Sequence, residues 1–211
     1  MNKKLAAALS CGAVLVLTLS GCSDDDNSAK VNDWSKKVCD KVQPQLQKIA
    51  NANAAIQQQT ADNSKPVDVQ KTDSAAFQQI SQAYKALGSA VDAAGPPPVD
   101  GGETTQKEAV KELNASSVAY ANLQKKVDAL DTKDQAKFAD GLKGIANELT
   151  KISSSGDESL KKLQSGEVGA AMAKQEGCQK PKASVPSKET GASEGATKPS
   201  EPASAAPGKK G

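Results

Sequence analysis

The sequence contains no histidine, and all 27 of its basic residues are lysines. Without imidazole, the chain lacks the side chain that most often serves as a general base or as a metal ligand. Without guanidinium groups, it cannot hold a phosphate or carboxylate through two parallel hydrogen bonds. It also has no glycine-rich phosphate loop and no cysteine and histidine cluster. We therefore expect a protein that is not an enzyme, with no catalytic residues, no metal site and no cofactor.

Strand signals and aromatic residues are also scarce. Aromatic residues form 2 % of the chain, and no segment alternates apolar and polar residues as a half-buried strand does. Apolar residues recur instead at steps of three and four, which is typical of helices packed side by side. We predict an all-α fold, an antiparallel bundle of about four helices. The stripes are Trp34, Val38, Val42, Leu46, Ile49 and Ile56; Phe77, Ile80, Tyr84, Leu87 and Val91; Val110, Leu113, Ser117, Tyr120, Leu123, Val127 and Leu130; and Phe138, Leu142, Ile145, Leu149 and Ile152.

Helix boundaries are predicted from capping residues and from glycine and proline. The first helix should end near Gln59, and Pro44 should bend it or cost it a hydrogen bond near Asp40. Residues 60–72 should form a loop, and Gly95-Pro96 should end the second helix. The pattern does not decide whether residues 133–176 form one bent helix or several. The predicted N-terminal caps are Asn32 or Asp33, Thr72 or Asp73, Thr105 with Glu108, and Thr132 with Gln135.

The first 22 residues have the features of an export signal. Lys3 and Lys4 precede an uncharged, largely apolar run from Leu5 to Leu19, which at 15 residues is shorter than the roughly 20 that a spanning helix needs. The following Leu19-Ser20-Gly21-Cys22 resembles the lipobox of bacterial lipoproteins, in which the cysteine sulfur receives a diacylglyceryl group before the signal is removed. The resemblance implies that Cys22 is lipidated and becomes the first residue of the mature chain.

Two of the four cysteines remain once Cys11 has left with the signal and Cys22 carries lipid. In an exported chain, Cys39 and Cys178 most simply form a disulfide, and the alternative is two free buried thiols. Such a bond would join the first helix to the end of the last.

The chain divides into four parts by composition. We predict a signal peptide at 1–21, a flexible tether at 22–31, a helical domain at 32–179 and a disordered tail at 180–211 that is rich in Pro, Ser, Ala and Lys. Between residues 28 and 179 lysines and acidic residues are equal in number, so no basic field favours nucleic-acid binding.

Three aromatic residues are the candidates for contact with a ligand or partner. Trp34 could be an exposed anchor, but its spacing to Val38 favours a place in or beside the core. Tyr84 and Tyr120 could line a ligand cavity between helices, but they too occupy core positions.

Paired carboxylates occur at Asp131 with Asp134 and at Asp157 with Glu158. They stand at predicted helix starts, where helix capping explains them better than acid–base chemistry. A buried acid with a strongly raised pKa in a cleft would instead indicate an enzyme.

The chain as a whole resembles the small secreted lipoproteins of actinobacteria. The resemblance covers the lipobox, the opening from Trp34 to Cys39, the stretch from Leu130 to Phe138, and Gly177-Cys178 before a Pro- and Ser-containing tail. The resemblance implies a location on the extracytoplasmic face of the membrane, held there by the lipid anchor. It implies no particular activity. We expect a non-catalytic module that binds an envelope protein or a wall component. The alternative is a carrier or sensor that holds a small apolar ligand between the helices near Tyr84 and Tyr120.

Overall fold

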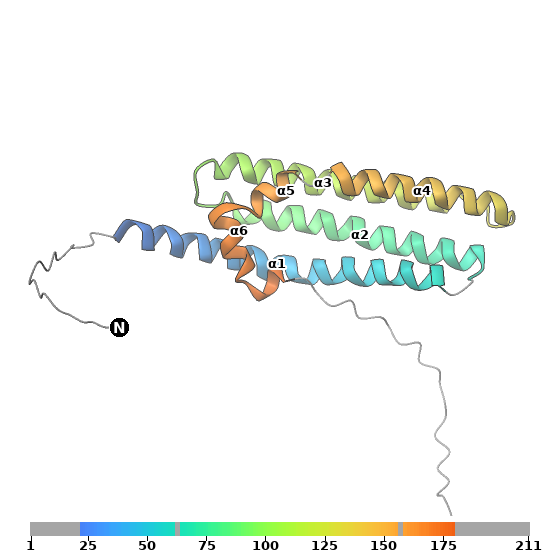
Figure 1. Cartoon of the computed structure of the whole chain (residues 1–211), viewed down its shortest axis with the longest axis horizontal. Helices are drawn as coiled ribbons and strands as arrows, with labels where there is room; N and C mark the ends of the chain where they lie inside the picture. Colours follow the sequence, from blue (N-terminus) through green and yellow to red (C-terminus); the bar gives the residue numbers. More distant parts are fainter. Residues whose placement is uncertain (1–21, 62–63, 156–157, 180–211) are drawn as a thin grey trace, which may run out of the picture.

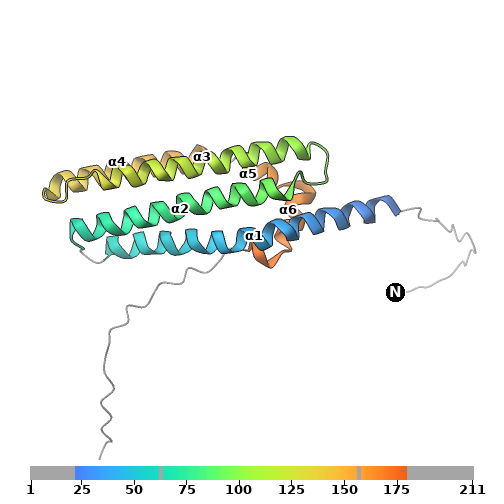
Figure 2. The same ribbon diagram turned by 180° about the vertical axis from the view of Figure 1, so that it is seen from behind.

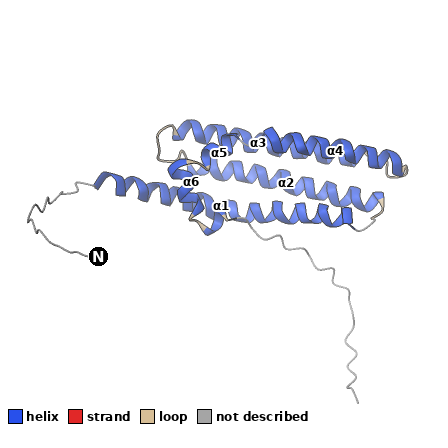
Figure 3. Ribbon diagram, viewed as in Figure 1, coloured by secondary structure: helices blue, strands red, loops and turns tan. Residues whose placement is uncertain are grey.

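A computed structural model describes residues 22–61, 64–155 and 158–179 (Figure 1). Within these ranges every regular element is a helix and none is a strand (Figure 3), so the predicted all-α bundle is confirmed. The predicted signal peptide, residues 1–21, and the predicted tail, residues 180–211, lie outside the described residues. The elements are α1 Cys22–Ala61, α2 Pro66–Ala94, α3 Gly102–Asp128, α4 Gln135–Ser155, α5 Glu158–Leu163, α6 Gly166–Ala173 and the short 3₁₀ helix η1 Glu176–Cys178.

The three longest helices form a layer that the later helices cover. Helix α2 packs against α1 on one side and against α3 on the other. Helix α4 runs back along α3, while α5 contacts α3 and α6 contacts α1. Figures 1 and 2 show α4, α5 and α6 on the same side of the layer, with α5 and α6 crossing from α3 towards α1.

The buried side chains form two clusters along the bundle. One cluster draws on α1, α2, α3, α5 and α6, and the other on α1, α2, α3 and α4. The predicted stripes supply most of their members, because a step of three or four residues keeps side chains on one helix face. The most deeply buried members are Val38, Cys39, Phe77, Ile80, Ala109, Leu123 and Val127.

The prediction of a flexible tether at residues 22–31 is wrong, because these residues form the start of α1. The segment from Ser23 to Lys30 contains neither glycine nor proline, and Asp24, Asp25 and Asp26 stand at the helix N-terminus, where negative charge is favourable. Residues 26–30 are exposed, and Val31, 2 % exposed, is the first residue of the core. Figure 1 shows this part of α1 extending beyond the other helices.

The predicted start of the second helix is also wrong, since α2 begins at Pro66 and includes Thr72 and Asp73. Proline fits the first helical position because its φ is already set and the amide hydrogen that it lacks has no partner there. The predicted end is confirmed, because Gly95 follows Ala94 with a φ of +76°. Helix α1 continues past Pro44 to Ala61, two residues beyond its predicted end.

The next two helices start at other residues than the predicted caps. Helix α3 begins at Gly102, directly after Gly101 with a φ of +71°, and not at Thr105. Helix α4 is capped by Asp134 and not by Thr132, because the Asp134 carboxylate accepts hydrogen bonds from the backbone N–H groups of Ala136 and Lys137, both at 3.1 Å.

Residues 133–176 form several helices and not one bent helix. They contain α4, α5, α6 and the start of η1. Gly166 has a φ of +59°, which glycine adopts without strain, and it turns the chain from α5 into α6. The breaks let this part of the chain leave α3 and reach α1.

Candidate functional site

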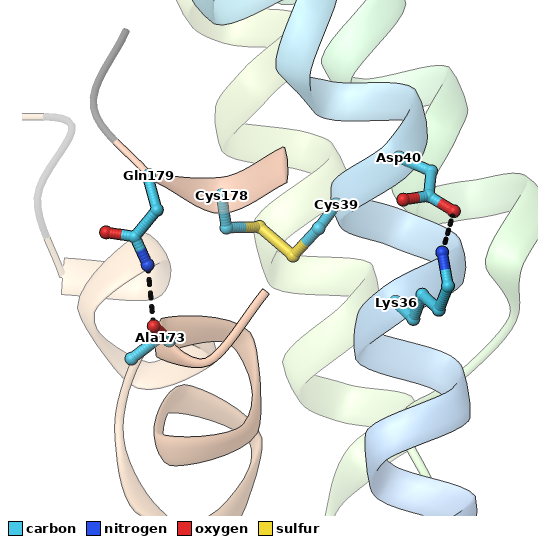
Figure 4. Close-up of a disulfide and its surroundings, with 6 residues drawn as sticks. All are labelled: Lys36, Cys39, Asp40, Ala173, Cys178 and Gln179. Atoms are coloured by element: carbon cyan, nitrogen blue, oxygen red, sulfur yellow. Dashed lines mark hydrogen bonds and ion pairs between the residues drawn. A yellow bond between two sulfur atoms is a disulfide. The ribbon is translucent and has the colours of Figure 1, made fainter. Parts of the chain in front are cut away.

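A disulfide joins Cys39 of α1 to Cys178 of η1 across a separation of 139 residues, as predicted (Figure 4). Gly177 lies so close to α1 that an added Cβ would be 2.5 Å from the backbone oxygen of Cys39. Gln179 then donates a hydrogen bond to the carbonyl of Ala173 at 2.6 Å. The C-terminal end of the described chain is therefore held against the middle of α1.

Trp34 belongs to the core and is not an exposed anchor. Its side chain is 7 % exposed, and its Nε1–H group donates a hydrogen bond to the carbonyl of Gly95 at 2.9 Å. This bond joins the first part of α1 to the end of α2, so the indole has both its apolar and its polar requirements met inside the fold.

Tyr84 of α2 and Tyr120 of α3 stack on each other, with ring centroids 5.5 Å apart and planes inclined by 12°. Phe77 lies next to Tyr120 at 6.1 Å. One turn from the stack, Ser81 donates a hydrogen bond to the carbonyl of Ser117 at 2.8 Å. Burial raises the pKa of Tyr120 to about 12, and burial together with Glu112 raises the pKa of Tyr84. Both phenols are therefore neutral near pH 7, and their rings stack on each other.

Asp73 is a buried acid, and its prediction as a helix cap is wrong. It lies inside α2, 7 % exposed, and its Oδ1 has no hydrogen-bond partner. Burial raises its pKa from 3.8 to about 6. The signal in the sequence was its spacing, because Asp73 stands four residues before Phe77 and therefore on the buried face of the helix.

A groove of about 510 Å³ runs between α3 and α4. Lys126 of α3 and Glu148 of α4 form an ion pair across it. Lys125 and Lys151 also line it, and among the described residues neither has an ion pair. The remaining lining residues are Ala119, Asn122 and Ile152.

A second hollow, of about 920 Å³, lies where the start of α1 meets the α2–α3 loop and the α5–α6 turn. It includes Asp100, Lys162 and Glu167, and Lys162 is paired with Glu108 at 3.2 Å. Tyr84, Tyr120 and Asp73 line neither hollow.

The carboxylates of the α3–α4 connection accept hydrogen bonds from backbone N–H groups. The expected capping role is confirmed for Asp134, whereas Asp131 lies between the two helices and caps neither. Asp131 accepts a hydrogen bond from the N–H of Lys133 at 2.9 Å. Asp134 caps α4, and hydrogen bonds from the backbone and side chain of Lys137 lower its pKa. Of the other predicted pair, Glu158 begins α5, and Asp157 lies outside the described residues.

Across residues 22–61, 64–155 and 158–179, no three or more Cys, Asp or Glu side chains gather as a metal site would require. No helix in the same ranges is both long and apolar enough to span a membrane. Cys22 is the first residue of α1, and its side chain lies outside what the structure describes.

Fold and site together define a disulfide-linked, all-α bundle. Comparison of the chain with known protein families, with curated proteins and with solved structures found no match. A function must therefore be argued from the residues themselves.

Proposed function

We propose that this chain is a non-catalytic lipoprotein that is anchored through Cys22 on the extracytoplasmic face of the cell membrane and binds an envelope protein or a wall component. The bundle would act by contact, as a rigid body. Features of the chain that bear on its location and the packing of its interior both support this proposal.

Two features of the chain support the extracytoplasmic location. The segment from Lys3 to Cys22 has the order of an export signal followed by a lipobox. The bond between Cys39 and Cys178 is typical of proteins that fold in an oxidising compartment outside the cytoplasm. Because α1 begins at Cys22, residues 22–30 would form a helical stalk of about 14 Å between the lipid and the bundle.

The stacking of Tyr84 on Tyr120 is the observation that favours contact over ligand carriage. A carrier would direct these rings at a ligand in a cavity. Here each ring covers the other at 5.5 Å, and the neighbouring positions are filled by Phe77 and by the bond from Ser81 to Ser117. The stack therefore favours contact over the alternative of a carrier that holds a small apolar ligand between these helices.

Replacement of Cys22 by alanine tests the anchor. We expect Cys22→Ala to abolish lipidation and to move the protein from the membrane fraction to the medium. Cys11→Ala is the matched control, because it removes a thiol from the predicted signal and should leave the protein on the membrane. A Cys22→Ala protein that stays on the membrane would contradict the anchor.

Native mass spectrometry of the purified, lipidated protein tests the carrier alternative. The proposal predicts a mass that equals the chain plus its covalent lipid. A small apolar molecule that co-purifies and is lost on replacing Tyr84 and Tyr120 by alanine would favour the carrier instead.

A further inference from the structure

We propose that the groove between α3 and α4, together with the adjoining outer face of α3, binds an acidic amphipathic segment of a partner protein. This inference rests on the proposed function and names the surface and the partner's chemistry. Three features of the surface support it: its shape, its apolar strip and its unbalanced charge.

The apolar strip follows from helix geometry. Lys111, Ala115, Val118, Asn122 and Lys125 are spaced by four, three, four and three residues, so they lie along one face of α3. Val118 is 60 % exposed, and Ala115 beside it is exposed as well. The middle of this face carries no charge, whereas a lysine stands at each end.

The groove continues this strip towards α4. Ala119, Asn122 and Lys125 belong both to the outer part of α3 and to the groove, and Ile152 of α4 forms its opposite wall. The aliphatic parts of lysine side chains add apolar surface below their charged ends. A partner side chain inserted into the groove would therefore meet carbon atoms on both walls, from Ala119 and from Ile152.

The charge of the surface selects the partner. Three lysines and one acid line the groove, and the acid, Glu148, already pairs with Lys126. Neither Lys125 nor Lys151 forms an ion pair with another described residue. Because lysines and acids are balanced over residues 28–179, this local excess is a property of the groove and not of the chain.

These features favour a peptide segment over a wall polymer. A polyanionic polymer would bind through the lysines alone and would gain nothing from Val118 or Ile152. An amphipathic helix carries apolar side chains on one face and carboxylates next to them. This matches a surface that is apolar in the middle, with Lys111 and Lys125 at its ends and Lys151 across the groove.

The test measures how tightly the full-length protein binds a synthetic helical peptide with leucines on one face and glutamates on the other. Fluorescence anisotropy of the labelled peptide reports the binding. We expect Val118→Asp to weaken peptide binding about tenfold or more, because it places a charge in the apolar strip. Val67→Asp is the matched control, since Val67 is 55 % exposed on α2, and it should change the affinity by less than about twofold.

A second pair of variants tests the charge. Lys125→Glu with Lys151→Glu should weaken binding about tenfold or more, whereas Lys41→Glu with Lys85→Glu, which changes the net charge equally at exposed sites elsewhere, should have little effect. Circular dichroism of each variant should match that of the parent, because every replaced side chain is exposed.

Several outcomes would overturn the inference: no peptide binding, equal binding of a scrambled peptide or of polyglutamate, or equal loss in the control variants. Equal binding of polyglutamate would indicate simple attraction of polyanions. Membrane fractionation keeps this test apart from that of the proposed function, because Val118→Asp should stay on the membrane and Cys22→Ala should still bind the peptide.

Discussion

Replacement of Asp73 by asparagine should stabilise this protein at neutral pH and leave its stability unchanged in acid. Asp73 is buried inside α2 with one carboxyl oxygen unpaired, and burial raises its pKa from 3.8 to about 6. Asparagine has nearly the same shape and carries no charge. The substitution therefore removes the cost of burying a carboxylate and alters the packing little.

The sign and size of the effect follow from proton linkage. The pKa of Asp73 is higher in the folded than in the unfolded protein, so the folded state holds the proton more tightly and stability falls as pH rises from about 4 to about 6. Below this window Asp73 is protonated in both the folded and the unfolded protein, so its ionisation does not lower the stability. Above it, a pKa difference of about two units corresponds to at most about 3 kcal/mol. For a domain of this size, that is about 6–12 °C in melting temperature.

The assay is thermal unfolding of both proteins, followed by circular dichroism from pH 4 to pH 8. The difference between Asp73→Asn and the parent should grow from near zero at pH 4 to its full value at pH 7, because effects of other carboxylates cancel in the difference. Asp140→Asn, at an exposed position on α4, controls for the loss of one negative charge. A difference that does not depend on pH, or an Asp73→Asn protein that is less stable at pH 8, would refute the reasoning.

Three further predictions concern the disulfide and two glycines. Replacing both Cys39 and Cys178 by alanine should lower the free energy of unfolding by up to about 5 kcal/mol, because the bond closes a loop of 139 residues in the unfolded chain; equal urea midpoints for variant and parent would contradict this. Gly177→Ala should destabilise the protein, since its Cβ would press on the backbone oxygen of Cys39. Gly144→Ala, in open space on α4, should instead stabilise it by up to about 1 kcal/mol. The same urea titrations check both glycine variants, and a Gly177→Ala protein as stable as its parent would show that η1 does not need its close approach to α1.

Local spacing predicted most of the helical structure correctly. The a/d rhythm of Phe77, Ile80 and Leu87 depends only on the chain's own geometry, so it identified the buried face of α2 without knowledge of its neighbours. The pairing of Cys39 with Cys178 followed by elimination, since the resemblance to a lipobox and an export signal accounted for the other two cysteines. Helix starts were predicted poorly, because several residues could begin each helix. Contacts with the neighbouring loop, such as that of Gly102 with Pro97, decide among them.

The sequence by itself determined that this chain forms a helical bundle and which thiols pair, because helix periodicity and cysteine count are local or countable properties. Only the tertiary structure decided that Asp73 is enclosed, that Tyr84 meets Tyr120 and that Lys125 and Lys151 flank one groove. Each of these depends on how helices distant in the chain approach one another. A repeat of three and four residues shows which face of a helix turns inward, but it does not identify the residue that lies opposite.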